Sequence, residues 1–288
     1  MWPGITERLD FWWQRASGCV DCSDDAEAFL AGRGPLTLQQ TRQAHYACFV
    51  EGVAAAVGAA ARTSCAVVVP YSMGLFAGYY FTSALGFEEA LWLMDQLCLL
   101  LQVQAQPRPY STGAIAGVPK LLIDKLLARA IEPVGLADWY DDDVFFVSGP
   151  EHAVEDVLAK ARGQGATYTK STPATAPYHT QALPFFEDAA RQCLSNTSVS
   201  PPRIPVISSI DGTIVRSSED VCREIVGNVC HTMNWRATIK AVASGPFQVT
   251  TVVECGSSVS LTEMVRHHLT VDPVDSTLTA LARSNATP

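Results

Sequence analysis

The sequence predicts an α/β fold, and the stretch around Pro70 is the first observation that indicates it. Three consecutive valines at 67–69 precede Pro70, a pattern typical of a strand that is buried on both faces and ends at the proline. From Met73 onward the residues suit a buried helix, in which the small residues Gly74 and Gly78 allow close packing. We therefore expect a strand, a tight turn and a helix.

The second observation lies in the middle of the chain. Residues 111–130 and 143–161 each have the pattern of a strand followed by a helix, and residues 166–172 have that of a closing strand. Alternation of strands and helices is typical of domains that combine a sheet with covering helices.

Composition and charge limit the function. Apolar residues make up 48% of the chain and charged residues 17%, which is enough apolar material for a sizeable core. The formal net charge of −9 argues against binding to nucleic acid or to anionic membrane surfaces. Residues 1–10 contain no apolar signal segment, so we expect a cytoplasmic protein.

A membrane span is the alternative interpretation of residues 64–87, which carry no charge and are long enough to cross a bilayer. Pro70 and three glycines interrupt this stretch, and its pattern changes halfway from strand to helix. We therefore expect no membrane segment.

The nine cysteines indicate neither a metal centre nor a disulfide framework. Cys19 and Cys22 form a C-x-x-C motif without a second pair at zinc-finger distance, and Cys222, Cys230 and His231 lack a fourth ligand at a recognisable spacing. We expect reduced, mostly buried thiols and no metal.

Ser72 is the candidate nucleophile, because it falls on the predicted turn between strand and helix. A serine there points into the crevice where open α/β sheets bind ligands. The backbone N–H of Met73, at the start of the helix, is placed to stabilise an oxyanion. The motif Pro70-x-Ser72-x-Gly74 lacks the first glycine of the G-x-S-x-G nucleophile elbow, so a purely structural serine stays open.

A serine nucleophile needs a base, and His179 is the best placed of the six histidines. It follows Pro177 in an otherwise uncharged loop, and catalytic residues often lie on loops carried by a rigid scaffold. His45 and His231 stand among apolar residues, where we expect them to serve packing.

Several segments, in the same order, resemble the acyltransferase family of malonyl-CoA:acyl-carrier-protein transacylases and polyketide-synthase acyltransferase domains. Residues 71–94 resemble the family's nucleophile segment, G-H-S-x-G, and residues 175–183 resemble the loop that carries its histidine. The other matching segments are residues 145–166, 204–215 and 252–268.

The resemblance implies an α/β-hydrolase-like large domain with a short parallel sheet, formed by residues 1–110 and 173–288. It also implies a small ferredoxin-like inserted subdomain at residues 111–172, with the active site in the crevice between the two.

The resemblance further implies a two-step transfer. Ser72 accepts an acyl group from acyl-CoA or an acyl carrier, and His179 acts as base and then as acid, oriented by the backbone carbonyl of Val259. The acyl group passes to the phosphopantetheine thiol of an acyl carrier protein, so no bound cofactor is expected. Polyketide or fatty-acid synthase components are the implied partners.

Departures from the family pattern concern the substrate. Tyr71 replaces the family's histidine before the serine, and we expect Tyr71 and Tyr178, the residue before His179, to contribute to substrate binding. Leu97 stands where the family has the arginine that binds a malonyl-type carboxylate. An unpaired buried carboxylate costs several kcal/mol, so we expect an uncharged acyl group. Alternatively, Leu97 is core and Arg108 bends in from the next loop.

A further departure is that residues 1–10 resemble the part of the family after its F-P-G-Q-G-S-Q motif, whose glutamine N–H is the second oxyanion donor. Three explanations fit the missing motif: a translational start placed too late, a different second oxyanion donor, or loss of catalysis. Gln43 matches a family glutamine lining the pocket. Two further functions of different class stay open, namely hydrolysis of acyl-carrier thioesters and a non-catalytic scaffold in an assembly line.

Overall fold

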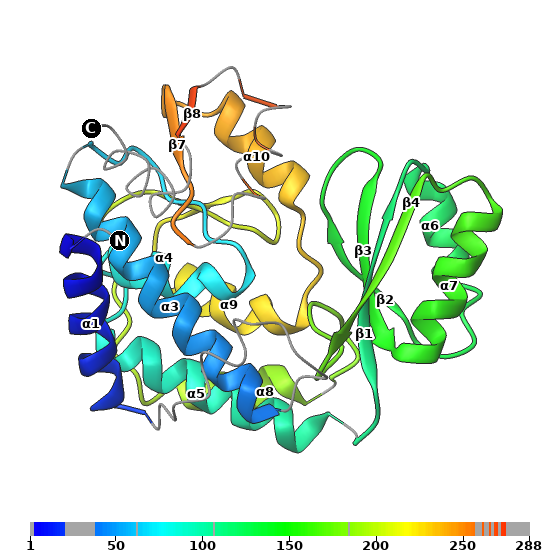
Figure 1. Cartoon of the computed structure of the whole chain (residues 1–288), viewed down its shortest axis with the longest axis horizontal. Helices are drawn as coiled ribbons and strands as arrows, with labels where there is room; N and C mark the ends of the chain where they lie inside the picture. Colours follow the sequence, from blue (N-terminus) through cyan, green and yellow to red (C-terminus); the bar gives the residue numbers. More distant parts are fainter. Residues whose placement is uncertain are drawn as a thin grey trace.

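The computed structural model describes residues 3–20, 38–61, 63–105, 107–183, 185–256, 261, 265, 268–269 and 272–274. A large helical body and a smaller unit, a sheet with helices on one face, lie side by side (Figure 1). Among the described residues no helix combines the length and the apolarity needed to span a membrane.

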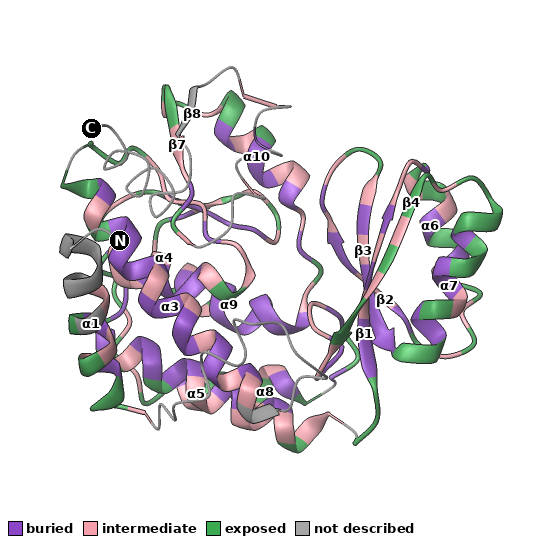
Figure 2. Ribbon diagram, viewed as in Figure 1, coloured by how far each residue is buried: buried purple, intermediate pink, exposed green. Residues whose placement is uncertain are grey.

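Helices dominate the large body, and their inward sides carry its core (Figure 2). The helices are α1 (Pro3–Ser17), α3 (Leu38–Ala60), α4 (Leu75–Phe81), α5 (Phe87–Gln104), α8 (Phe186–Leu194), α9 (Ser218–Cys230) and α10 (Trp235–Ser244). Tyr46, Phe49, Tyr79 and Phe87 are among the largest fully buried side chains. This aromatic core holds α3, α4 and α5 together.

The smaller unit is the inserted sheet, with elements in the order β1 (Tyr110–Ala116), α6 (Lys120–Leu127), β2 (Gly135–Trp139), β3 (Val144–Pro150), α7 (Glu151–Gly163) and β4 (Tyr168–Ala174). All strand pairs are antiparallel, and the strand order is β2-β3-β1-β4. This β-α-β-β-α-β sequence is the ferredoxin-like arrangement. Strand β2 is absent from the strand and helix pattern predicted from the sequence.

A glycine explains how tightly α7 covers this sheet. A Cβ atom at Gly113, in the middle of β1, would lie 2.9 Å from side-chain atoms of both Val154 and Leu158 on α7. The missing side chain therefore lets the helix approach the strand closely.

The β structure of the large body is smaller than predicted. Residues 67–69 are partly exposed and form one parallel bridge, between Val68 and Val206, where a strand buried on both faces was expected. Beside it lie the antiparallel pair β5 (Val206–Ile207) and β6 (Ile214–Val215), and elsewhere the parallel pair β7 (Thr251–Val253) and β8 (Asp272–Val274). Pro70 has no N–H to donate, which ends the pairing after Val68. The α/β class holds, with helices supplying most of the core.

Candidate active site

The nucleophile turn has the predicted position and an unusual backbone. Ser72 begins a short 3₁₀ turn, η1 (Ser72–Gly74), that leads directly into α4. Its φ is +48°, in the left-handed region that residues other than glycine seldom adopt. Backbone strain of this kind is concentrated at functional sites. The small residue Gly78 lets α4 pack against Pro70, since a Cβ atom there would lie 3.2 Å from the proline Cβ.

His179 lies within hydrogen-bond reach of this serine. The distance from Ser72 Oγ to His179 Nε2 is 3.0 Å, so the hydroxyl can donate to a neutral imidazole. His179 is also held in the left-handed region, at φ +60°, and its backbone N–H donates to the carbonyl of Val229 at 2.6 Å. The tertiary structure therefore assembles the serine and histidine that the sequence singled out.

The last turn of α9 supports both members of this pair. Besides the Val229 contact, the Asn228 side chain donates from Nδ2 to the Ser72 carbonyl oxygen at 3.3 Å. Sequence reasoning missed both residues. A capping box at Ser217 and Asp220 marks the start of α9. Nothing in the local sequence shows that the other end of that helix meets Ser72.

Burial changes the pKa of His179. Removal from water lowers the pKa of His179 from 6.5 to about 4, an effect that the nearby Asn228 backbone carbonyl partly opposes. The imidazole is therefore neutral at pH 7, as a general base must be. No described residue forms a hydrogen bond with its Nδ1 atom. Val259, the predicted orienting residue, lies outside the described residues, so its role stays a prediction.

The backbone N–H of Met73 is the first candidate for stabilising an oxyanion. It follows Ser72 on the η1 turn, and no described residue accepts a hydrogen bond from it. The Met73 side chain is itself exposed. Gln43, which we expect to line the substrate pocket, is fully buried on α3, and α3 packs against η1.

Tyr71 links the nucleophile turn to the inserted sheet. Its hydroxyl donates to Asp138 on β2 at 2.7 Å, and its ring packs edge-on against Trp235 with a centroid distance of 4.9 Å. Asp138 also accepts the backbone N–H of Trp235 at 3.1 Å. Burial raises the pKa of Asp138 to about 6, against the opposing effect of these bonds. Tyr71 thus connects the two units, and its role in substrate binding stays a prediction.

Leu97 belongs to the apolar core of the large body. It lies on α5 and is 3% exposed, and Tyr178 packs against the same core cluster. The Tyr178 hydroxyl is 2.9 Å from the hydroxyl of Thr175. A role for either residue in substrate binding stays a prediction.

Two arginines bear on whether the site can hold a carboxylate. Arg108, the alternative partner, donates to Glu132 at 2.6 Å on the surface and lies 5.5 Å above the Tyr110 ring. Arg42, next to Gln43 on α3, forms a partly buried ion pair with Asp95, which also accepts from Tyr46. Both guanidinium groups are therefore engaged by protein carboxylates.

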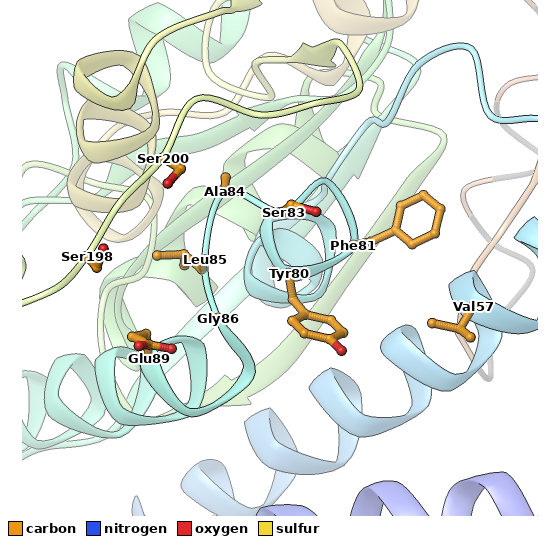
Figure 3. Close-up of a pocket in the computed structure, with 10 residues that line it drawn as sticks. All are labelled: Val57, Tyr80, Phe81, Ser83, Ala84, Leu85, Gly86, Glu89, Ser198 and Ser200. Atoms are coloured by element: carbon orange, nitrogen blue, oxygen red, sulfur yellow. The ribbon is translucent and has the colours of Figure 1, made fainter.

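A hollow of about 530 Å³ lies elsewhere, at the far end of α4 (Figure 3). Tyr80, Phe81, Glu89 and Ser198 are among its lining residues, whereas neither Ser72 nor His179 is. We do not assign this hollow to the acyl group, because the reacting hydroxyl does not face it.

Proteins similar to this chain are known both from their sequences and from solved structures. No protein-family model matches the chain. Malonyl CoA-acyl carrier protein transacylase of Buchnera aphidicola is 23% identical over 202 residues, which cover 70% of this chain and 64% of that protein. The Bacillus subtilis protein of the same name is 24% identical over 216 residues, covering 72% and 52%. The matched region is therefore less than two thirds of each relative.

Solved structures agree with these relatives. FabD from Acinetobacter baumannii superposes with a TM-score of 0.82 at 18% identity, covering 96% of this chain and 90% of that one. The PlMCAT:AntF complex, described as a type II polyketide synthase acyl carrier protein with its malonyl transacylase, gives 0.78 at 18%, covering 97% and 92%. The acyltransferase domain from the second module of the salinomycin polyketide synthase gives 0.76 at 20%, covering 98% and 66%.

The resemblance seen in the sequence motifs is thus confirmed: the chain is similar in sequence to malonyl-CoA acyl carrier protein transacylases, and it has the fold that they share with polyketide-synthase acyltransferase domains.

Proposed function

We propose that this protein is an acyltransferase that moves an acyl group between thioesters through an acyl-Ser72 intermediate. The contact of 3.0 Å between Ser72 Oγ and His179 Nε2 is the observation that carries the proposal. The strained turn before α4 and the neutral histidine support it, because a serine nucleophile needs an exposed hydroxyl and an adjacent base. The similarity to transacylases supports the same chemistry.

The proposed reaction has two matched halves. Ser72 Oγ attacks the thioester carbonyl while His179 takes its proton, and the collapse of the tetrahedral intermediate expels a thiolate that His179 protonates. The incoming thiol then gives its proton to His179 and attacks the serine ester, and His179 returns this proton to Ser72 Oγ as the serine is released. The N–H of Met73 stabilises the oxyanion in both halves. The reaction uses these groups alone and calls for no bound cofactor.

The acceptor that we propose is the phosphopantetheine thiol of an acyl carrier protein. A similar transacylase has been solved in complex with an acyl carrier protein, which supports this kind of partner. Acyl-CoA or a second acyl carrier would serve as donor, in fatty-acid or polyketide synthesis. A cytoplasmic location stays a prediction from the sequence.

The acyl group that we propose is uncharged. Leu97 offers only apolar atoms, and the ion pairs of Arg42 with Asp95 and of Arg108 with Glu132 already occupy both guanidinium groups. Among these described residues, a malonyl carboxylate would compete with Asp95 or Glu132 for the guanidinium groups or stay unpaired. Leaving a buried carboxylate unpaired costs several kcal/mol, which corresponds to roughly a hundredfold or more in discrimination.

Intact-protein mass spectrometry tests this proposal. The wild type and Ser72→Ala are incubated with malonyl-, acetyl-, medium-chain and aromatic acyl-CoA, and then with a holo acyl carrier protein. We expect an adduct on the wild type from neutral donors, none on Ser72→Ala, and passage of the acyl group to the carrier.

Other outcomes assign the remaining functions. Loss of the adduct to free acid, with an unmodified carrier, would establish thioester hydrolysis instead. A malonyl adduct of comparable yield would refute the uncharged acyl group. No adduct from any donor, with the protein folded, would refute catalysis and favour a scaffold.

A further inference from the structure

Next along the chain to the α9 residues that contact Ser72 and His179, three side chains with metal-binding atoms converge. Cys230 ends α9, His231 follows it, and Glu187 lies in the first turn of α8. A thiol sulfur, a ring nitrogen and a carboxylate oxygen from these residues all lie within 4.8 Å of one another, the one such group found among the described residues. The sequence pattern placed Cys230 and His231 together but could not supply Glu187, which is distant along the chain.

The His231 ring is partly exposed and hydrogen-bonded to Glu187, whereas the sequence predicted a packing role. The backbone turns out of the helix at this residue, with φ −108° and ψ 146°. A Cβ atom at Gly227 would lie 2.9 Å from Nδ1, so the absence of a side chain there makes room for the ring. Nε2 then reaches Oε1 of Glu187 at 2.8 Å.

The three groups differ in how ready they are to bind a cation. The hydrogen bond from His231 lowers the pKa of Glu187, so the carboxylate is charged at pH 7. Burial raises the pKa of the Cys230 thiol to about 12, and the thiol donates to the Val226 carbonyl at 3.2 Å. A metal ion that takes this sulfur must displace its proton, as zinc does with coordinating thiols.

We propose that Cys230 Sγ, His231 Nε2 and a Glu187 carboxylate oxygen form a binding site for one zinc ion, a borderline-soft divalent cation. Thiolate and imidazole select zinc over magnesium or calcium, which prefer oxygen ligands. Binding breaks the hydrogen bond between His231 and Glu187, and the imidazole proton moves by way of solvent from Nε2 to Nδ1 so that Nε2 has a free lone pair. Metal bonds of about 2.3 Å to sulfur and about 2.0 Å to nitrogen and oxygen form, and the thiol proton is released to solvent. A water completes the tetrahedron, since the His231 and Glu187 side chains are 35% and 41% exposed.

The site is continuous with the catalytic support. Asn228 and Val229 contact Ser72 and His179, and the next two residues are zinc ligands. A zinc ion would tie the end of α9 to α8 and so stiffen the segment that positions His179. The inference stands on the ligand geometry and does not depend on acyl transfer, so it survives if the proposed function fails.

Zinc titration of the chelator-stripped full chain, with a chromophoric competitor, tests the proposal. We expect the wild type to bind one equivalent of zinc at this site. Cys230→Ala and His231→Gln should bind zinc there at least about a hundredfold more weakly, so that this equivalent is lost from the titration. Glu187→Gln should bind it at least about tenfold more weakly. Cys222→Ser, which removes another thiol from the same helix, and Ser72→Ala should bind as the wild type does. Zinc should raise the midpoint of thermal unfolding of the wild type, Cys222→Ser and Ser72→Ala, and of none of the ligand variants.

Cobalt(II) gives a readout of the ligands themselves. The wild type should show a thiolate-to-cobalt charge-transfer band and visible bands of tetrahedral strength, and His231→Gln should lose them. The His231 and Glu187 variants alter partly exposed side chains, so they carry the test if Cys230→Ala does not fold. Equal zinc stoichiometry and affinity in the wild type and His231→Gln, or a wild-type cobalt spectrum without the thiolate band, would overturn the proposal.

Discussion

The reactivity of Ser72 should stay nearly constant from pH 7 down to pH 5, because burial keeps His179 neutral. With a pKa of about 4, the neutral fraction of His179 falls by a factor of only about 1.1 between pH 7 and pH 5, against about 25 for an ordinary pKa of 6.5. The assay is the rate of covalent modification of Ser72 by a fluorophosphonate, which requires a neutral base and no particular acyl specificity. Intact mass reports the product directly.

Control variants separate the effect of His179 from a loss of the fold. Ser72→Ala should remain unmodified, His179→Gln should react slowly at every pH, and intrinsic fluorescence should show that the protein stays folded at pH 5. A fall in rate of about 25-fold over this range, with an apparent pKa near 6.5, would refute the reasoning. It would mean that water reaches the imidazole and that the site is more open than the contacts of His179 indicate.

Three further predictions concern the surroundings of the site. The folded-state pKa of Asp138, about 6, lies above the ordinary 3.8, so its stabilising effect is full below pH 3.8 and is lost as the pH rises through 6. In urea titrations, the wild type should lose about 2 kcal/mol of unfolding free energy between pH 4.5 and 7 relative to Asp138→Asn. The same change of unfolding free energy with pH in both proteins would contradict this. Asn228→Ala should lower stability by about 1 kcal/mol and slow the modification of Ser72, whereas the exposed Asn196→Ala should change neither; equal modification rates would refute a supporting role. Leu97→Ala should cost about 2 to 4 kcal/mol and Leu97→Met less than about 1.5, and a loss below 1 kcal/mol for the alanine would show that Leu97 is not core.

Local signals in the sequence single out Ser72 and His179 as candidates for the proposed catalytic pair. Ser72 follows a proline-terminated stretch and precedes a helix, and His179 lies in an uncharged loop after Pro177. Similarity to a known family then related two positions that are distant in the sequence. The contact at 3.0 Å agrees with both inferences.

The remaining parts of the site depend on contacts that no local pattern encodes. That Tyr71 replaces a histidine is visible in the sequence, but its partner Asp138 comes from the inserted sheet. The strand that carries Asp138, β2, was missed, because its five residues, GLADW, include a glycine and an acid that do not favour a strand. The valines at 67–69 have a strong strand propensity, so the sequence predicted a strand buried on both faces. The structure has only one parallel bridge there, because a buried strand also needs neighbouring strands.

By itself, the sequence determined the α/β class, the turn at Ser72 and the strand and helix pattern around β1, β3 and β4, because these follow from short-range periodicity, proline and glycine. The choice of His179 also depended on the resemblance to a known family. Only the tertiary structure decided what surrounds the pair. It brought the end of α9 against Ser72 and His179, Glu187 against His231, and Asp138 against Tyr71. These contacts arise from the packing of whole helices and of the sheet against the aromatic core, which depends on the complete chain and on no segment alone.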